Sequence, residues 1–172
     1  MSEPIDPYAT HLPVLRKLAT HLHVRSVLEF GGGLHSTKLF LDRAVFPALD
    51  ELVTLESSLA WATRLYGEID DPRWTCVVAP EVMHPRIAPL FGLGFDIALI
   101  DGATSAERLH AMLAAQYLAQ VLVGHDTEQE YWNAIRPRLV GYYTEHVYDE
   151  LTPHTSVWVP KGSALSKELA NE

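Results

Sequence analysis

The chain has 172 residues, of which 48% are hydrophobic and 20% are charged. A chain of this length is most simply one domain, which buries roughly two thirds of its unfolded surface without a second core. Thirteen basic residues against 22 acidic residues give a formal charge of -9. Because a negative surface repels polyanions, we predict that the protein has no nucleic-acid partner.

The cysteine content and the N-terminal sequence bear on the compartment. Cys76 is the one cysteine and lies in an apolar run, so we expect a buried thiol and no intramolecular disulfide. The first residues are acidic and lack the basic and apolar parts of a signal peptide. No apolar run reaches the ~18 residues that span a membrane. We therefore predict a cytoplasmic protein with no membrane partner.

The first half of the chain predicts helices that alternate with strands. Leucines at helical spacing predict an N-terminal helical segment within residues 1–24, centred on a helix at 7–23. Hydrophobic runs and turn residues then predict a strand at 26–30, a helix at 35–45, a strand at 51–56, a helix at 59–69 and a strand at 74–79. Three prolines make 80–94 a short or broken helix.

The second half continues the alternation. It predicts a strand at 95–101, a helix at 105–117, a strand at 120–124, a helix at 128–136, and strands at 140–148 and 155–160 that pair as an antiparallel hairpin. Residues 25–160 thus form the main domain, and 161–172 form a polar C-terminal tail, either helical or frayed. The alternation indicates a Rossmann-like, doubly wound α/β fold with a mostly parallel sheet and helices on both faces.

Residues 25–37 read as a short apolar strand that opens onto three glycines before a helix. Glycines let a ligand approach the backbone closely, as in nucleotide-binding loops. The carboxylate of Glu29 should repel a phosphate and attract an ammonium or sulfonium group, which favours S-adenosylmethionine over NAD or ATP. Gly31-x-Gly33-x-x-Ser36 is only a partial dinucleotide-binding match, and no P-loop lysine follows. A plain connecting turn is the alternative.

Several segments together resemble the class I S-adenosylmethionine-dependent methyltransferases, over nearly the whole chain. They are VLEFGGG at 27–33 with Ser36 and Thr37, Glu56 at the end of the second strand, FDIALIDG at 95–102 and VLVGHD at 121–126. The last of these, followed by Thr127 and Glu128, looks most like the small-molecule O-methyltransferases. The resemblance implies a seven-stranded sheet with an antiparallel edge, and S-adenosylmethionine as the cofactor.

The same resemblance implies roles for individual residues. Glu29 and the three glycines would face the methionine part of the cofactor, and Glu56 would accept hydrogen bonds from both ribose hydroxyls. Asp101 would orient the cofactor's amino group or the substrate. The predicted cofactor-binding set is Glu29, Gly31, Gly32, Gly33, Ser36, Glu56, Ser57 and Asp101. Alternatively, Glu56 is a solvated strand end, and Asp101 caps the turn that follows its strand. Glu81 could also accept a hydrogen bond from the adenine amino group, or it is simply exposed.

His125 and Asp126 follow the fifth predicted strand. Many of the resembled proteins hold a divalent metal there with two acids, or with an acid and an amide. Magnesium prefers oxygen ligands, so His125 weakens that reading. We therefore predict no metal ligands. Asp101 and Asp126 could still serve as two magnesium ligands, and a softer metal is an open alternative. Alternatively, His125 is a general base oriented by Asp101, and these two are our predicted catalytic residues. A local backbone contact is the simpler reading of His125.

The favoured function is an S-adenosylmethionine-dependent methyltransferase that acts on a small hydroxylated acceptor. Methyl transfer needs mainly alignment and removal of a proton, so the sequence points to the cofactor more clearly than to the acceptor. A non-catalytic S-adenosylmethionine-binding or interaction module is the first alternative, and a nicotinamide-dependent oxidoreductase is the second. The short N-terminal addition predicts an open cleft or one completed by a second subunit, which leaves a homo-oligomer open.

Overall fold

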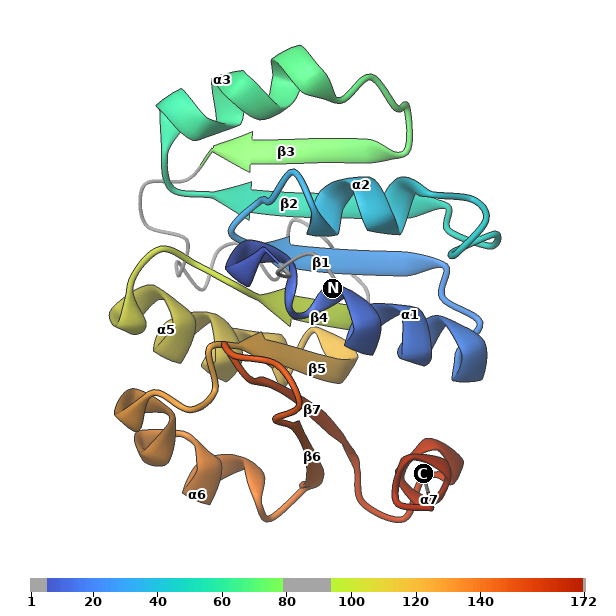
Figure 1. Cartoon of the computed structure of the whole chain (residues 1–172), viewed down its shortest axis with the longest axis vertical. Coiled ribbons are helices and arrows are strands. Elements are labelled where there is room, and N and C mark those ends of the chain that lie inside the picture. The colour runs from blue at the N-terminus through green and yellow to red at the C-terminus, as the bar shows by residue number, and fades with distance from the viewer. Residues whose placement is uncertain (1–5, 79–93, 172) are drawn as a thin grey trace, which may run out of the picture.

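The computed structural model describes residues 6–78 and 94–171, drawn in colour in Figure 1. The predicted broken helix at 80–94 and the adenine contact at Glu81 lie outside or almost wholly outside these ranges. No helix of the described ranges is long and apolar enough to cross a membrane.

A seven-stranded sheet forms the centre of the molecule, with the strand order β3-β2-β1-β4-β5-β7-β6 (Figure 1). The strands from β3 to β5 pair in parallel, and β7 pairs antiparallel with both β5 and β6. This confirms the predicted fold class, including the terminal hairpin. The strands are β1 (Ser26–Phe30), β2 (Glu51–Glu56), β3 (Trp74–Val78), β4 (Phe95–Ile100), β5 (Ala119–His125), β6 (Tyr143–Tyr148) and β7 (Thr155–Pro160).

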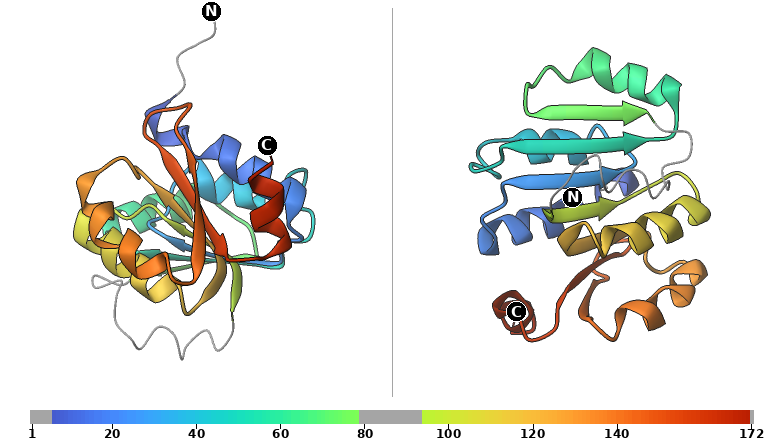
Figure 2. Two further views of the ribbon diagram at one scale, coloured as in Figure 1. Left: turned by 90° about the horizontal axis from the view of Figure 1, so that it is seen from below. Right: turned by 180° about the vertical axis from the view of Figure 1, so that it is seen from behind.

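Helices cover both faces of the sheet, as the left view of Figure 2 shows. One buried apolar cluster joins α1, α2, α3 and α7 to the sheet, and a second joins α5, η2 and α6 to the opposite face. The helices are η1 (Pro7–Ala9), α1 (Leu12–His21), α2 (Ser36–Leu41), α3 (Leu59–Glu68), α5 (Ser105–Ala115), η2 (Glu130–Ala134), α6 (Arg136–Leu139) and α7 (Ala164–Leu169).

Three predicted helices are shorter or divided in the structure. The N-terminal one splits into η1 and α1, because Pro13 occupies the first turn of α1, where proline favours a helix start. The second ends at Leu41, since Asp42 takes an extended backbone. The predicted helix at 128–136 is a 3₁₀ turn followed by the short α6, again with a proline in its first turn.

The C-terminal segment is more ordered than a frayed tail. The Ser163 hydroxyl accepts a hydrogen bond from the backbone N–H of Ser166 and caps α7. Leu165 and Leu169 of this helix are buried in the same apolar cluster as α1. The helical alternative for this segment is therefore the one observed, and α7 packs against the main domain.

The two faces of β1 pack against different helices, and this determines the surroundings of Glu29. Val27 belongs to the cluster beneath α1 and α2, whereas Leu28 and Phe30 belong to the cluster beneath α5. Side chains alternate along a strand, so Glu29 points to the same side as Val27. That side is covered by α2, and this decides what the Glu29 carboxylate can contact.

Candidate functional site

The glycine loop after β1 lies against the carboxyl end of β4. Gly31 has a φ of +84°, and a Cβ at this position would lie 2.5 Å from the backbone oxygen of Asp101. A Cβ on Gly32 would lie 2.5 Å from Leu65 Cδ1. Gly31 meets backbone and has a positive φ, so the loop can take this path only with glycine at this position. A Cβ on Gly32 would require the side chains of Leu65 and Thr54 to move.

The backbone N–H groups of the three glycines are all bonded within the protein. Gly31 donates to the Leu55 carbonyl at 2.9 Å. Gly32 donates to Glu56 Oε2 at 3.1 Å, and Gly33 donates to Thr37 Oγ1 at 3.2 Å. A phosphate-binding loop presents such groups to its ligand. This loop has none of the three to offer.

Glu29 lies beneath the loop, with none of its surface exposed. Its carboxylate accepts hydrogen bonds from three hydroxyls, those of Ser36 at 2.6 Å, Thr37 at 2.8 Å and Thr54 at 2.7 Å. Burial raises the pKa of Glu29 to about 7, against the opposing effect of these hydrogen bonds. The expectation that Glu29 faces a ligand therefore needs correction: it ties β1, α2 and β2 together, and its charge is weaker than the sequence suggested.

Glu56 ends β2 and is only 6% exposed. Its Oε2 accepts from Gly32 N–H, and its Oε1 accepts from the backbone N–H of Ser58 at 2.7 Å. Ser58 in turn caps α3 through the backbone N–H of Trp61. Each carboxylate oxygen thus has one partner and keeps further acceptor capacity. The loop and the start of α3 hold this carboxylate at the edge of a cavity.

That cavity, the nucleoside hollow, has a volume of about 300 Å³. It lies at the carboxyl ends of β1, β2 and β4, the position where open α/β sheets bind ligands. Leu55 and Ala111 add apolar surface to its wall. The predicted residues that line it are Gly31, Gly32, Glu56, Ser57 and Asp101.

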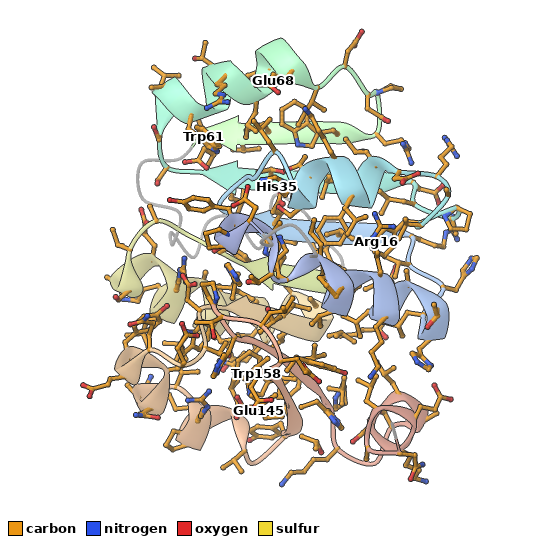
Figure 3. The ribbon with its side chains drawn as sticks, in the orientation of Figure 1. Arg16, His35, Trp61, Glu68, Glu145 and Trp158 are labelled. Atoms are coloured by element: carbon orange, nitrogen blue, oxygen red, sulfur yellow. The ribbon has the colours of Figure 1, made fainter. Side chains whose placement is uncertain are left out.

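A second cavity, the N-terminal hollow, has a volume of about 580 Å³. Tyr8 and His11 from the N-terminal segment line it, together with Gly33, Ser36 and His35 from the loop and the start of α2. Gly32, Trp61, Asp101, Gly102 and Ala103 border both hollows and form their shared wall. Figure 3 labels two of these lining residues, Trp61 at the start of α3 and His35 before α2. Both volumes are within or close to the range of small-ligand sites, about 300–1,000 Å³.

His125 and Asp101 meet, as predicted, but His125 is nearly inaccessible. The ring is 3% exposed and lines neither hollow. Its Nδ1 lies 3.2 Å from Asp101 Oδ1, and its Nε2 lies 2.8 Å from the hydroxyl of Thr10. A general base must reach the proton that it removes, so direct contact between His125 and an acceptor in either hollow needs a rearrangement of this ring.

Asp101 is the better connected of the predicted catalytic residues. Its Oδ1 also accepts from Arg108 Nη2 at 3.0 Å, and Arg108 pairs with Asp126 as well. Burial works to raise the pKa of Asp101, but the hydrogen bond and charge of His125 and the charge of Arg108 outweigh it, and the pKa is lowered. Asp101 is therefore a carboxylate on the shared wall of the two hollows.

Two residues of the site were not singled out by the sequence. Trp61 donates from Nε1 to the Gly32 carbonyl at 2.6 Å and so braces the loop. Its place three residues after a serine helix cap was the available signal. His11 lines the N-terminal hollow and is 1% exposed. Nothing near His11 in the sequence marks it, because its neighbours in the site come from β4 and β5.

Known structures share this architecture. A caffeoyl-CoA O-methyltransferase-like protein from Staphylococcus aureus aligns with a TM-score of 0.69 at 11% identity, covering 91% of this chain and 85% of that one. Cofactor-bound Rv0187 from MTB aligns with a TM-score of 0.64 at 19% identity, covering 95% and 84%. An rRNA methylase from Streptococcus thermophilus aligns with a TM-score of 0.58 at 12% identity, covering 92% and 99%.

The chain has the class I methyltransferase fold. The predicted resemblance is thus confirmed at the level of the fold, which is what identities this low establish. No family model and no curated protein matches the chain in sequence.

The prediction that nucleic acid is excluded as a partner is wrong. The rRNA methylase shares the fold over nearly all of its own length, so the fold does not argue against an RNA acceptor. The net charge of -9 describes the whole surface. It does not describe the local field at a site lined by Arg64 and Arg108.

Proposed function

We propose that the protein is an S-adenosylmethionine-dependent methyltransferase, with the nucleoside part of the cofactor in the nucleoside hollow. The observation that carries this proposal is Glu56, a carboxylate held by two backbone N–H groups at the edge of that hollow. A carboxylate accepts two donors at once, and the ribose cis-diol supplies two. Apolar walls from Leu55 and Ala111 suit a purine ring.

The bonding of the glycine loop favours this cofactor over NAD or ATP. All three glycine N–H groups already have partners inside the protein, so they are not free to bind a pyrophosphate or triphosphate. S-adenosylmethionine carries no phosphate, so it does not need free N–H groups in this loop. This argument replaces the one from the charge of Glu29, which lies behind the loop, and it speaks against a nicotinamide-dependent oxidoreductase.

The N-terminal hollow is the proposed place of the acceptor. It adjoins the nucleoside hollow across the wall that includes Asp101 and Gly102. The carboxylate of Asp101 would orient the cofactor's amino group or an acceptor hydroxyl from there. The volume of about 580 Å³ suits a small hydroxylated molecule, or one hydroxylated unit of a larger acceptor.

Calorimetry with S-adenosylhomocysteine tests the cofactor site. Wild type should bind, and Glu56→Gln should weaken binding by about 1.5–3 kcal/mol, or roughly 10- to 100-fold, because a charged acceptor for two hydroxyls is lost. Glu68→Gln is the matched control, since Glu68 is a partly exposed glutamate of α3 whose partners are Lys38 and Arg64. Its affinity should equal that of wild type. Absence of binding at millimolar ligand, or tighter binding of NAD, would overturn the proposal.

Turnover separates an enzyme from a binding module. Labelled S-adenosylmethionine is offered with a panel of small phenols, catechols and alcohols, and with RNA in parallel. We expect methyl transfer to at least one hydroxylated small molecule. Transfer to RNA would keep the enzyme and change the acceptor, whereas binding without any transfer would favour the non-catalytic module.

A further inference from the structure

Three potential metal ligands lie close together where the chain before α1 packs against the end of β5. His11 precedes α1, Asp101 follows β4, and His125 ends β5. One ligand atom of each lies within 4.8 Å of the other two. Both imidazoles are at least 97% buried. The cluster is therefore enclosed by protein except where His11 and Asp101 line the N-terminal hollow.

The hydrogen bonds of His125 fix which nitrogen carries a proton. The Thr10 hydroxyl lies 2.8 Å from the Pro153 carbonyl, which only accepts, so Thr10 must donate its single proton there. Its oxygen then accepts from His125, which assigns a proton to Nε2. In the neutral ring, the Nδ1 lone pair therefore faces Asp101 Oδ1 at 3.2 Å. Two lone pairs at this distance repel unless a proton or a metal cation lies between them.

Within residues 6–78 and 94–171, His11 has no hydrogen-bond partner for either ring nitrogen, although both nitrogens are buried. Leaving a buried polar atom unbonded costs about 1–3 kcal/mol, and native structures seldom do so without a reason. A neutral imidazole has one nitrogen with a lone pair, and no hydrogen bond from the described residues occupies it here, so it is free to bind a metal. Its ring meets that of His125 edge-on, with centroids 4.7 Å apart.

We propose that His11, Asp101 and His125 form a binding site for a divalent transition metal, with Zn²⁺ as the reference ion. Tetrahedral bonds of about 2.0–2.1 Å put two ligand atoms about 3.3–3.4 Å apart. The His125–Asp101 pair already has this spacing at 3.2 Å. The other separations, at most 4.8 Å, need to close by at most about 1.5 Å, and a turn of the unbonded His11 ring can supply this.

The donor set and its surroundings favour a transition metal over magnesium. Two imidazoles and one carboxylate suit zinc or iron, whereas Mg²⁺ prefers oxygen ligands. Thr10 orients His125 from behind, and Arg108 holds the Asp101 carboxylate, as outer partners do at metal sites. With both histidines neutral, as metal ligands are, Asp101, Asp126 and Arg108 together have a formal charge of -1, so a dication is not opposed by the local charge. The sequence alone led us to predict no metal here.

The site would have an open coordination position toward the N-terminal hollow. Three protein ligands leave room for a fourth, as in catalytic zinc sites. An acceptor hydroxyl in that hollow is the class of ligand that fits, and coordination would lower its pKa. This assignment of the fourth ligand rests on the proposed methyltransferase function. The binding of the metal by the three side chains does not.

The test uses the EDTA-treated, dialysed full chain without cofactor or acceptor. Calorimetry with Zn²⁺ should give one site per chain, which millimolar Mg²⁺ does not block. His11→Gln and Asp101→Asn should each weaken Zn²⁺ by about 100-fold or more, beyond the 10- to 100-fold that loss of an outer partner causes. His35→Gln is the matched control and should bind Zn²⁺ as wild type does, because His35 lines the same hollow and pairs with Asp6 instead.

Wild-type protein loaded with Co²⁺ gives an answer that needs no variant. We expect the intense visible absorption of a four- or five-coordinate ion with nitrogen ligands, in proportion to one Co²⁺ per chain. The weak spectrum of the hexaaqua ion, no Zn²⁺ binding, or equal losses in His11→Gln and His35→Gln would overturn the proposal. Since S-adenosylhomocysteine binding is measured separately on the same sample, failure of the metal site is distinguished from failure of the cofactor site.

Discussion

The two hollows share a wall but are built in different ways. The nucleoside hollow is formed mainly by the residues that immediately follow β1, β2 and β4, and its polar groups are fixed by backbone contacts such as those of Glu56. The N-terminal hollow depends on Tyr8 and His11, which reach the site because the chain between η1 and α1 packs against His125 at the end of β5. The proposed cofactor site is thus formed by the sheet itself, and the proposed acceptor site depends on the segment that packs against the sheet.

This difference decides which substitutions act on both hollows and which act on one. Gly32 and Trp61 belong to the shared wall. Gly31 lines only the nucleoside hollow but lies against the backbone of Asp101, another residue of that wall. Glu29 supports that wall from beneath and touches neither hollow. Substitutions in these residues therefore test whether a change in the shared wall affects ligand binding in both hollows together.

The largest effect is expected for Gly31→Ala. Its Cβ would lie 2.5 Å from the Asp101 carbonyl oxygen, and its φ of +84° disfavours any side chain. Positive-φ strain costs about 1–3 kcal/mol, and a forced backbone shift costs about 1–3 kcal/mol more. We expect a loss of about 2–6 kcal/mol in the free energy of unfolding. Affinity for S-adenosylhomocysteine should also fall below detection, as measured by denaturant unfolding and calorimetry.

Gly67→Ala is the control for this experiment. Gly67 lies in α3, and a Cβ there would meet no atom within 4 Å. Alanine is the better helix former by about 1 kcal/mol, so this variant should be at least as stable as wild type and should bind the ligand equally well. If Gly31→Ala is as stable as Gly67→Ala and binds the ligand as well, the loop can move away from β4 without loss of stability or affinity. The close contact between Gly31 and Asp101 would then not be required for the site.

The next largest effect is a dependence of the free energy of unfolding on pH, caused by Glu29. The pKa of Glu29 is 4.5 in the reference state and is raised by burial to about 7 in the folded protein. The folded state therefore binds more protons between these values, and stability falls as pH rises through this window. The loss is about 3 kcal/mol in total and is complete above pH 7. Glu29→Gln keeps the shape and cannot ionise, so it should lack this loss.

The measurement is urea unfolding of wild type and Glu29→Gln between pH 4 and pH 8. The free energy of unfolding of wild type minus that of the variant should decrease with pH and then level off. At pH 5 both proteins should bind S-adenosylhomocysteine with similar affinity, because Glu29 lies outside both hollows. A difference that stays constant with pH would mean that the three hydroxyls keep the pKa of Glu29 near its ordinary value.

Much of the sheet and of the nucleoside hollow could be predicted because the signals are local. The positions of the strands along the chain, the glycine loop and the place of Glu56 at a strand end all follow from runs of fewer than ten residues. The orientation of Glu29 could not be predicted in the same way. A parallel strand buried on both faces is apolar throughout, so β1 carries no alternation to say which side α2 covers, and the burial of all four residues Val27 to Phe30 bears this out.

The N-terminal hollow, the proposed acceptor site, was harder to predict because its contacts are long-range. Thr10 and His125 are 115 positions apart and yet share a hydrogen bond. No spacing rule links two residues at such a separation, and the N-terminal segment looked like a helix that only covers the sheet. For the same reason His125 was expected to face the cleft, whereas Thr10 and His11 cover it.

The smallest effect is expected for Trp61→Phe, which removes one donor and keeps an aromatic ring against Arg64. This change removes part of the ring that lines both hollows and, with it, the hydrogen bond from Nε1 to the Gly32 carbonyl. Such a bond contributes about 0.5–1.5 kcal/mol, so affinity for S-adenosylhomocysteine should fall by roughly 2- to 12-fold. Tyr66→Phe is the matched control, because it removes a hydrogen bond from the same helix to the Cys76 carbonyl, away from both hollows. Equal losses in the two variants would mean that α3 acts through general stability. A loss confined to Trp61→Phe would mean that it braces the loop.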